Sequence, residues 1–440
     1  MFAIAKNPHK RAVSWSRLRF SVRTLLVLMG LLGLCFAWCA SAMQQERHRR
    51  YLSAKAEAVG GYVDYEDQTP QWRLDLRLIR NWFGQDTLAS VERVQFFCDS
   101  DPKGTNDSLA VLHEFPDVPR VDLYGRSFSD DCIVHLRQAA NLTELHLDQT
   151  AITSKGLSSL GNKNRLTHLF VSLPLDADEL LGGLSGLQYL ELLTLDNTNV
   201  TSAGLTILKS LPHLEDLYLK SARGADELGD DALSEIATVS SLKFLWIERS
   251  VRITDEGINQ LCKLRKLQSL SLNLASSISP ATARSIAALP DLENINLAGV
   301  VVGDDGFREL TRSRNLKKMS LRHANVTDVG ACELGQLKGL TSLELSETPI
   351  SDATLAVIGQ LRNLDSLMLR GTAVTDAGLI HLKKLPNLKN LLLDGSRITD
   401  EGILHLQMLS QLDFVAVGST VTAEGRARLE KSLPNCHVIP

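Results

Sequence analysis

The chain has 440 residues, of which 44% are hydrophobic and 22% are charged, and its formal net charge at pH 7 is -4. This length exceeds that of one ordinary core, so the chain is expected to contain either several domains or a repeat array. The composition argues against wholesale disorder and against a protein with many membrane spans. The small net charge argues against a nucleic-acid partner, because phosphate binding needs a strongly basic surface.

An uncharged apolar run follows a basic leader. Residues 24–43 read TLLVLMGLLGLCFAWCASAM, and a helix of this length reaches about 30 Å, the thickness of a bilayer core. The leader, residues 1–23, carries six Lys and Arg residues, against four in residues 44–58. Basic residues favour the cytoplasmic side. We therefore expect a cytoplasmic leader, a transmembrane signal anchor at residues 24–43, and the remainder of the chain outside the cytoplasm.

Other interpretations of this segment stay open. Ala40-Ser41-Ala42 fits the small-residue site of a cleaved signal peptide, which would release a secreted chain near Ala42. The leader is long for a signal peptide, so we favour the retained anchor. Lipidation of Cys35 and the opposite orientation are further alternatives.

Residues 44–117 are expected to form a stalk and an N-terminal cap. Residues 44–58 are polar helix formers, and Gly60-Gly61 would end that helix. Residues 62–65 read as a short strand, and residues 72–83 carry apolar side chains at helical spacing. A distinct terminal unit is expected because a solenoid exposes its core at each end.

A unit of about 24 residues recurs thirteen times over residues 118–435. It is clearest in LRNLDSLMLRGTAVTDAGLIHL, residues 361–382, and LPNLKNLLLDGSRITDEGILHL, residues 385–406. The L-x-L part alternates as a strand, whereas G-L-x-x-L has helical spacing. Units must stack to bury these leucines, which predicts an α/β solenoid curved as a horseshoe, with a parallel sheet on the concave face and helices on the convex face. Residues 436–440 form the C-terminal end.

Two further features of the unit have a structural interpretation. The Thr-Asp pair, as in Thr254-Asp255, supplies side-chain oxygens that can accept hydrogen bonds from the first amides of the helix. The glycine that follows, as at Gly257, Gly378 and Gly402, would allow the helix to approach the neighbouring backbone closely.

The repeat resembles the leucine-rich repeat family. It is nearest to the cysteine-containing subtype, but a small residue stands where that subtype often has Cys, at Thr150, Thr198, Ser250, Thr348 and Thr372. The subtype occurs in F-box adaptors; the sequence shows no F-box-like segment between the span and the first repeat, so that role is not carried over. The layout is also similar to bacterial single-span membrane-anchored leucine-rich repeat proteins, most of whose functions are undefined.

The cysteines form no C-x-x-C pair, which argues against a zinc site. Small buried thiols inside repeats are the expected role for most of them. A disulfide between Cys98 and Cys132 is an alternative if the domain is exported.

No enzyme motif is found in the sequence, and no cofactor or metal is expected. One polar group remains, in which Glu144, His146 and Asp148 alternate on one strand, with Asp122 and His168 on the strands beside it. These residue types could ligate a divalent metal or share protons. A solvated strand face with mixed charge is the ordinary explanation of these residues, so a metal-dependent enzyme is the least favoured alternative.

The residue between the second and third leucines of each unit defines a row along the concave face. Aromatic residues gather in its first half, at Phe170, Tyr218 and Trp246, and Phe244 points to the same side. Large exposed aromatics are typical anchors of protein interfaces. The four residues are therefore the predicted binding patch, beside an acidic loop at residues 221–233. Simple coverage of the sheet is the alternative, because strands favour aromatic residues anyway.

Together these features predict a membrane-anchored leucine-rich repeat protein that recognises or scaffolds another protein through its concave face. A glycan is the second choice of ligand. A structural or self-associating envelope protein is the alternative function.

Overall fold

The computed structural model describes residues 47–65, 91–97, 106–161, 165–172, 177–222, 228–250, 252–273 and 277–439. The chain divides into two compact units, and the larger, here called the repeat unit, comprises residues 56–64 and 91–440. The other comprises residues 1–55 and 65–90. A helix covers residues 47–57, and Gly60, with a φ of 78°, ends it as predicted.

One sheet runs through the repeat unit, and its sixteen described strands follow chain order. Every pair from β2–β3 to β15–β16 is parallel. The strands are β1 (Gly61–Tyr65), β2 (Val91–Phe97), β3 (Arg120–Tyr124), β4 (Glu144–Asp148), β5 (His168–Ser172), β6 (Leu192–Thr198), β7 (Asp216–Ser221), β8 (Phe244–Glu248), β9 (Ser269–Asn273), β10 (Asn294–Asn296), β11 (Lys318–Ser320), β12 (Ser342–Glu344), β13 (Ser366–Met368), β14 (Asn390–Leu392), β15 (Phe414–Ala416) and β16 (His437–Ile439).

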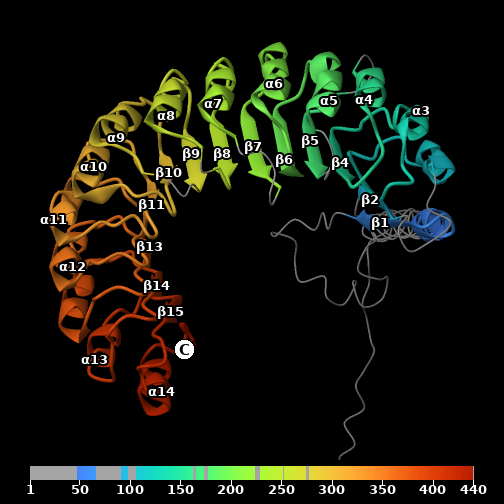
Figure 1. Ribbon diagram of the computed structural model, residues 1–440. Coiled ribbons are helices and arrows are strands. Elements are labelled where there is room, and N and C mark those ends of the chain that lie inside the picture. Colours follow the sequence, from blue (N-terminus) through green and yellow to red (C-terminus); the bar gives the residue numbers. More distant parts are fainter. Residues whose placement is uncertain are drawn as a thin grey trace, which may run out of the picture. The chain divides into compact units, whose positions relative to one another are not determined.

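Short helices connect the strands and line the outer side of the repeat unit, while the strands line its inner side (Figure 1). The α-helices are α3 (Ile133–Leu136), α4 (Ser154–Leu160), α5 (Ala177–Leu181), α6 (Ser202–Leu205), α7 (Asp230–Ile236), α8 (Asp255–Leu261), α9 (Pro280–Ala287), α10 (Gly303–Leu310), α11 (Asp328–Ala331), α12 (Asp352–Ile358), α13 (Ile403–Leu406) and α14 (Ala423–Ser432). The 3-10 helices are η1 (Asn106–Glu114), η2 (Asp130–Cys132), η3 (Gly182–Gly186), η4 (Thr206–Ser210), η5 (Leu334–Gln336) and η6 (Asp376–Lys384).

Strands β3 to β15 coincide with the thirteen predicted repeats. The leucines of each strand point into the space between sheet and helices, where Leu145 and Leu147 of β4 are 0% and 1% exposed. The intervening residues of β4 are half-buried on the other side of the sheet. The small residues at the family's cysteine position are buried, as at Thr150 and Ser250. The predicted leucine-rich repeat solenoid is therefore confirmed.

The Thr-Asp pair behaves as predicted in its first residue and differently in its second. Thr254 caps its own helix, because its hydroxyl accepts a hydrogen bond from the Glu256 amide at 3.2 Å. The carboxylate of Asp255 instead accepts a hydrogen bond from the Ser279 amide in the next repeat, at 2.9 Å. Asp230 accepts in the same way from the amide and hydroxyl of Thr254, at 2.8 and 2.6 Å. The aspartate therefore joins adjacent repeats rather than capping its own helix.

This inter-repeat link recurs along the solenoid and is present in every repeat from Asp304 onward. The linked pairs are Asp130–Thr153, Asp178–Thr201, Asp230–Thr254, Asp255–Ser279, Asp304–Thr327, Asp328–Ser351, Asp352–Thr375, Asp376–Thr399 and Asp400–Thr422. The repeat glycine lies against the aspartate, so that a Cβ at Gly257 would stand 2.2 Å from Oδ1 of Asp230. The predicted close approach at this glycine is confirmed.

Several predictions concern residues that the structure does not describe. These are the anchor at residues 24–43, the helix at residues 72–83, Cys98 and residues 223–227 of the acidic loop. Within the described residues, no helix is both long and apolar enough to cross a membrane. Cys132 is buried, and burial together with the charge of Asp130 raises the pKa of its thiol to about 12. Cys132 is a free thiol in the structure, which argues against the disulfide that the sequence left as an alternative.

Both ends of the sheet extend beyond the predicted repeats. Strand β2 pairs with β3 at the N-terminal end, and Val94 and Phe96 of β2 are fully buried. At the other end β16 pairs with β15 in residues that the sequence left as a plain C-terminal end. Val94 and Phe96 stand in register with Val121 and Leu123 of β3, so β2 continues the alternation of the repeat, while β1 and β16 form the two edges of the sheet.

Candidate functional site

Strand register places the predicted row of side chains on neighbouring strands from β3 to β15. Each member pairs with the next, from Asp122 with His146 to Leu392 with Ala416. The row consists of Asp122, His146, Phe170, Thr194, Tyr218, Trp246, Ser271, Asn296, Ser320, Glu344, Met368, Leu392 and Ala416. The periodicity of the repeats therefore determined the composition of this row correctly.

Three central strands carry the candidate site. Nine side chains of β6, β7 and β8 share the inner face and are here called the β6–β8 face. They are Leu192, Thr194, Asp196, Asp216, Tyr218, Lys220, Phe244, Trp246 and Glu248. The alternating burial of each strand sends the residues between them into the core, which leaves these nine on the surface.

The aromatic patch of this face consists of Tyr218, Phe244 and Trp246. The rings of Tyr218 and Phe244 are stacked, with centroids 4.8 Å apart and an interplanar angle of 26°. The ring of Tyr218 also lies 5.7 Å from that of Trp246, at an angle of 52°. Trp246 is 39% exposed. The structure thus brings together three of the four predicted residues, and one of them is open to solvent.

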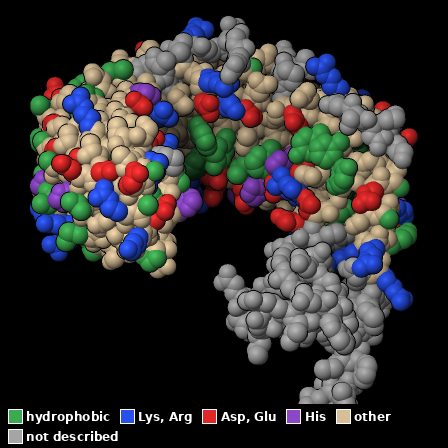
Figure 2. Space-filling view, turned by 90° about the horizontal axis from the view of Figure 1, so that it is seen from below, with side chains coloured by type: hydrophobic (Ala, Val, Ile, Leu, Met, Phe, Trp, Pro, Cys, Tyr) green, Lys and Arg blue, Asp and Glu red, His purple; other side chains and the backbone are tan. Residues whose placement is uncertain are grey.

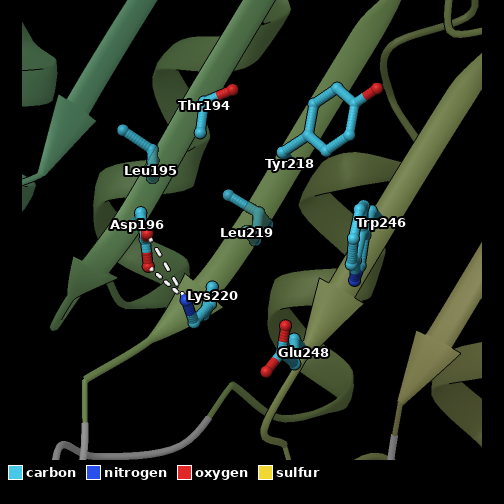
Figure 3. Close-up of a pocket in the computed structure, with 8 residues that line it drawn as sticks. All are labelled: Thr194, Leu195, Asp196, Tyr218, Leu219, Lys220, Trp246 and Glu248. Atoms are coloured by element: carbon cyan, nitrogen blue, oxygen red, sulfur yellow. Dashed lines mark hydrogen bonds and ion pairs between the residues drawn. The ribbon is translucent and has the colours of Figure 1, made fainter.

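An open pocket of about 190 Å³ lies beside these rings. Figure 3 shows the ring of Tyr218 and the indole of Trp246 side by side on β7 and β8, with Lys220 and Glu248 farther along these strands and Asp196, the partner of Lys220, on β6. On β6 the pocket is also lined by Thr194 and Leu195. The pocket therefore combines two aromatic walls with charged groups at one end.

The fourth predicted residue, Phe170, lies apart from the other three. It sits on β5, and Thr194 of β6 separates it from Tyr218 in the row. Its ring stacks on His146 instead, with centroids 3.9 Å apart. Sequence could place Phe170 on the correct face, but only the side-chain conformations show which neighbour it contacts.

Acidic side chains surround the aromatic patch. Lys220 pairs with Asp196 at 3.0 Å, and Glu248 lies 3.7 Å from Arg249. Asp216 has no hydrogen bond or ion pair from its carboxylate to any residue in the part of the chain that the structure describes. Burial raises the pKa of Asp216, and the nearby carboxylate of Glu215 adds to that effect.

The sequence analysis missed these charged residues as part of the site. Asp216 and Phe244 stand two residues before the row, whereas Asp196, Lys220 and Glu248 stand two residues after it. The period of two along a strand predicts that such residues share the face, so the signal was present in the sequence.

The polar group near the N-terminal end of the sheet is held together by ion pairs. Arg120 contacts Asp122 at 2.8 Å and Glu144 at 3.0 Å, and Nε2 of His146 lies 2.6 Å from Glu144. Burial raises the pKa of Asp122, but hydrogen bonds from Arg120 and Gln95 and the charge of His146 lower it further than burial raises it. A hydrogen bond from His146 holds the pKa of Glu144 below its usual range.

This arrangement does not resemble a metal centre. Within the described ranges, no group of three or more His, Cys, Asp or Glu side chains is placed to hold a metal ion. Asp122 is fully buried and already accepts hydrogen bonds from Arg120 and Gln95. The network joins β2, β3 and β4 and so stabilises the N-terminal end of the sheet.

A second aromatic stack lies at that end and was not predicted. Phe97 and Tyr124 stack with centroids 4.5 Å apart and an interplanar angle of 3°, and Tyr62 meets Phe97 edge-on at 5.9 Å. The stack joins β1, β2 and β3. Its residues lie outside the row that the repeats define, which is why the motif analysis passed over them.

Comparison with known proteins supports the fold. No family model matches the chain, and no curated protein matches it in sequence. Among solved structures the chain is similar to an internalin (inlF) from Listeria monocytogenes, with 20% identity and a TM-score of 0.53 over 83% of this chain and 92% of that one. A leucine-rich repeat protein from Leptospira interrogans has 20% identity and a TM-score of 0.43 over 74% of this chain and 91% of that one.

The likeness to the internalin, together with the repeating strand and helix, establishes the class of the molecule. The chain has the leucine-rich repeat fold, a form of solenoid whose parallel sheet lies on one face. At 20% identity the likeness shows the fold alone.

Proposed function

We propose that this protein recognises another protein through the β6–β8 face, and that residues 24–43 hold it in a membrane with the repeats outside the cytoplasm. The observation that carries the proposal is the aromatic patch, in which Trp246 is 39% exposed beside the rings of Tyr218 and Phe244. Aromatic side chains at the centre of an interface commonly supply much of the binding energy.

The surface around the patch suits recognition because its backbone is well supported. Strands β6, β7 and β8 are paired on both sides, and the leucines beneath them, such as Leu217 and Leu245, are fully buried. A partner therefore meets side chains whose positions are already set, which reduces the entropy lost on binding. Burying one exposed aromatic side chain would contribute roughly 1.5–3 kcal/mol.

Site-specific photocrosslinking in membranes tests this proposal. A benzoylphenylalanine placed at Thr194, in the pocket beside Tyr218, should crosslink to a specific protein. The double variant Tyr218→Ala, Trp246→Ala should abolish the crosslinked band, because it removes both aromatic walls.

The matched control carries the same crosslinker at Tyr189, which is 61% exposed and lies outside the strands. This control should give no such band. Bands that persist in the double variant, with an unchanged melting temperature, would contradict recognition through this face.

Self-association is the alternative function, and one observation favours it. On the helical side Ile380 and Leu404 occupy the same position in adjacent repeats and are 39% and 59% exposed, and Met408 nearby is 67% exposed. If the protein assembles with itself, the purified chain should form oligomers that a Leu404→Glu, Met408→Glu variant does not form. Sedimentation velocity of the parent chain and of the double variant would show whether only the parent forms oligomers.

A further inference from the structure

We propose that the β6–β8 face selects a basic segment of its partner, with an arginine or lysine side chain lying against the rings of Tyr218 and Trp246. This inference rests on the proposed function and adds the chemical character of the partner. It follows from three observations: the geometry of the rings, the balance of charge around them, and the contrast with the rest of the inner face.

The rings offer faces to a cation. Tyr218 and Trp246 stand on adjacent strands with centroids 5.7 Å apart and planes inclined by 52°, and they wall an open pocket (Figure 3). A guanidinium or ammonium group is attracted to the negative face of an aromatic ring, and most strongly to tryptophan. The aliphatic stem of such a side chain would also cover the apolar surface of the rings.

The charges around the rings favour the same guest. The β6–β8 face carries three carboxylates, Asp196, Asp216 and Glu248, against one ammonium group, Lys220. Lys220 is paired with Asp196 at 3.0 Å, and its positive charge therefore balances the charge of that carboxylate. Of the other two carboxylates, Glu248 lies 3.7 Å from Arg249 at one end of the strands, and Asp216 at the other end has no ion pair within the described residues.

Asp216 has cations in its surroundings, His168 and Lys243, but in the described part of the chain no direct ion pair reaches its carboxylate. Burial, Glu215 and Glu191 all raise the pKa of Asp216, whereas His168 and Lys243 lower it by less. A positively charged guest would lower the cost of keeping this half-buried carboxylate ionised.

The combination of an acidic surplus with clustered aromatic rings is not repeated on the strands that follow β8. On β9 the inner-face residues are Ser269, Ser271 and Asn273, all uncharged. At the same three positions of the repeats from β10 to β15 there are three cations, Lys318, Arg322 and Arg370, against two carboxylates, Glu344 and Asp394, so the excess of acid is not repeated there. Figure 2 shows hydrophobic side chains on the inner face with acidic and basic ones beside them.

Three synthetic peptides of equal length test the inference with the full chain in mild detergent. They are fluorescein-labelled GSRLRSG, the same peptide with citrulline for both arginines, and the same peptide with glutamate for both. Citrulline keeps the shape of arginine and removes its charge. Fluorescence anisotropy should show the arginine peptide binding about tenfold more tightly than the citrulline peptide, and the glutamate peptide should not bind.

Variants locate the binding. Trp246→Leu and Asp216→Asn should each weaken binding of the arginine peptide about fivefold to tenfold. The matched controls are Phe414→Leu, an aromatic residue of the same sheet on β15, and Glu344→Gln, a carboxylate on β12. Both controls should leave the affinity unchanged, and all variants should keep the parent melting temperature.

Equal affinity of the arginine and citrulline peptides, with loss of both in Trp246→Leu, would overturn the charge inference and leave the proposed function standing. Binding of the arginine peptide that survives Trp246→Leu and Asp216→Asn would place the basic segment elsewhere and overturn it as well. If none of the three peptides binds, the inference of a basic partner segment is also wrong. The proposed function is tested separately, by the crosslinking experiment.

Discussion

At the scale of the residue, the position of the repeat glycine, three residues after the capping Thr or Ser, is occupied either by glycine or by threonine where the preceding repeat has the linking aspartate. Where the repeat has glycine, the aspartate of the preceding repeat fills the space that a side chain would need. In two repeats the position holds Thr282 or Thr354, both almost fully buried. The hydroxyl of Thr354 donates a hydrogen bond of 2.5 Å to Asp328. Opposite an aspartate, the position therefore holds either no side chain or a threonine; where the preceding repeat has no aspartate, a small apolar residue can be buried there instead, as Ala232 is.

Replacing a repeat glycine with alanine should destabilise the protein. In Gly378→Ala the new Cβ would stand 2.3 Å from Oδ1 of Asp352 and would disturb the link to Thr375. We expect a loss of roughly 1–3 kcal/mol in the free energy of unfolding, as for other overpacked sites. Urea unfolding followed by circular dichroism measures it. The control is Gly182→Ala, where a Cβ meets no atom within 4 Å; an equal loss in both variants would refute the steric explanation.

At the scale of the element, the aspartate link turns a series of short helices into a connected layer. Each carboxylate accepts hydrogen bonds from a neighbouring repeat, as Asp328 does from the amide and hydroxyl of Ser351, at 2.9 and 2.6 Å. Helices of four to ten residues have little stability alone, so such contacts between repeats matter. The link also explains why the repeat has Thr or Ser followed by Asp.

The link should make stability depend on pH in the acid range. Burial raises the pKa of Asp328, but hydrogen bonds from Ser351 and Thr354 outweigh it and hold the pKa below its ordinary value. A carboxyl whose pKa is lowered by folding contributes stability that is fully present above its unfolded pKa of about 3.9 and is lost as the pH falls through the folded value. Asp328→Asn should therefore cost about 1–2 kcal/mol at pH 7 and clearly less near pH 3.

Unfolding free energies of the parent and of Asp328→Asn at pH 7, 5 and 3 provide the measurement. Asp305→Asn is the control, because Asp305 is 76% exposed and is paired with Arg308 of its own helix. A difference between parent and Asp328→Asn that stays constant over this range would show that the charge of Asp328 is irrelevant to the link.

At the scale of the whole molecule, the repeat unit has an uneven inner face. Charged and aromatic residues gather on β3 to β8, whereas serine and asparagine prevail from β9 to β11. The uninterrupted aspartate link begins at Asp304, in the other half of the solenoid. The repeats thus divide broadly between a half with a varied surface and a half with regular internal contacts.

The proposed anchor makes a prediction about topology. Alkaline phosphatase fused after residue 440 should be active in a bacterial host, because the proposed topology retains the basic leader in the cytoplasm and exports the repeats. The same fusion without residues 24–43 should be inactive, since the enzyme needs disulfides that form outside the cytoplasm. An active fusion without the segment, or an inactive one with it, would contradict the proposed topology.

The sequence by itself determined the repeat, the number of units from 118 to 435, and the face on which each strand residue lies. Two periods suffice for this, because a leucine that alternates along a strand has one side of the sheet on which to be buried. The row from Asp122 to Ala416 was therefore predictable, including the aromatic residues within it.

Only the tertiary structure decided which side chains on that face contact one another. Phe170 stacks on His146 rather than joining the aromatic patch, and Lys220 pairs with Asp196. The aspartate of each repeat reaches its neighbour instead of its own helix, as Asp255 does. Periodicity specifies the direction of a Cβ, whereas contacts depend on side-chain rotamers and on the spacing of adjacent repeats, which are set when the repeats pack together.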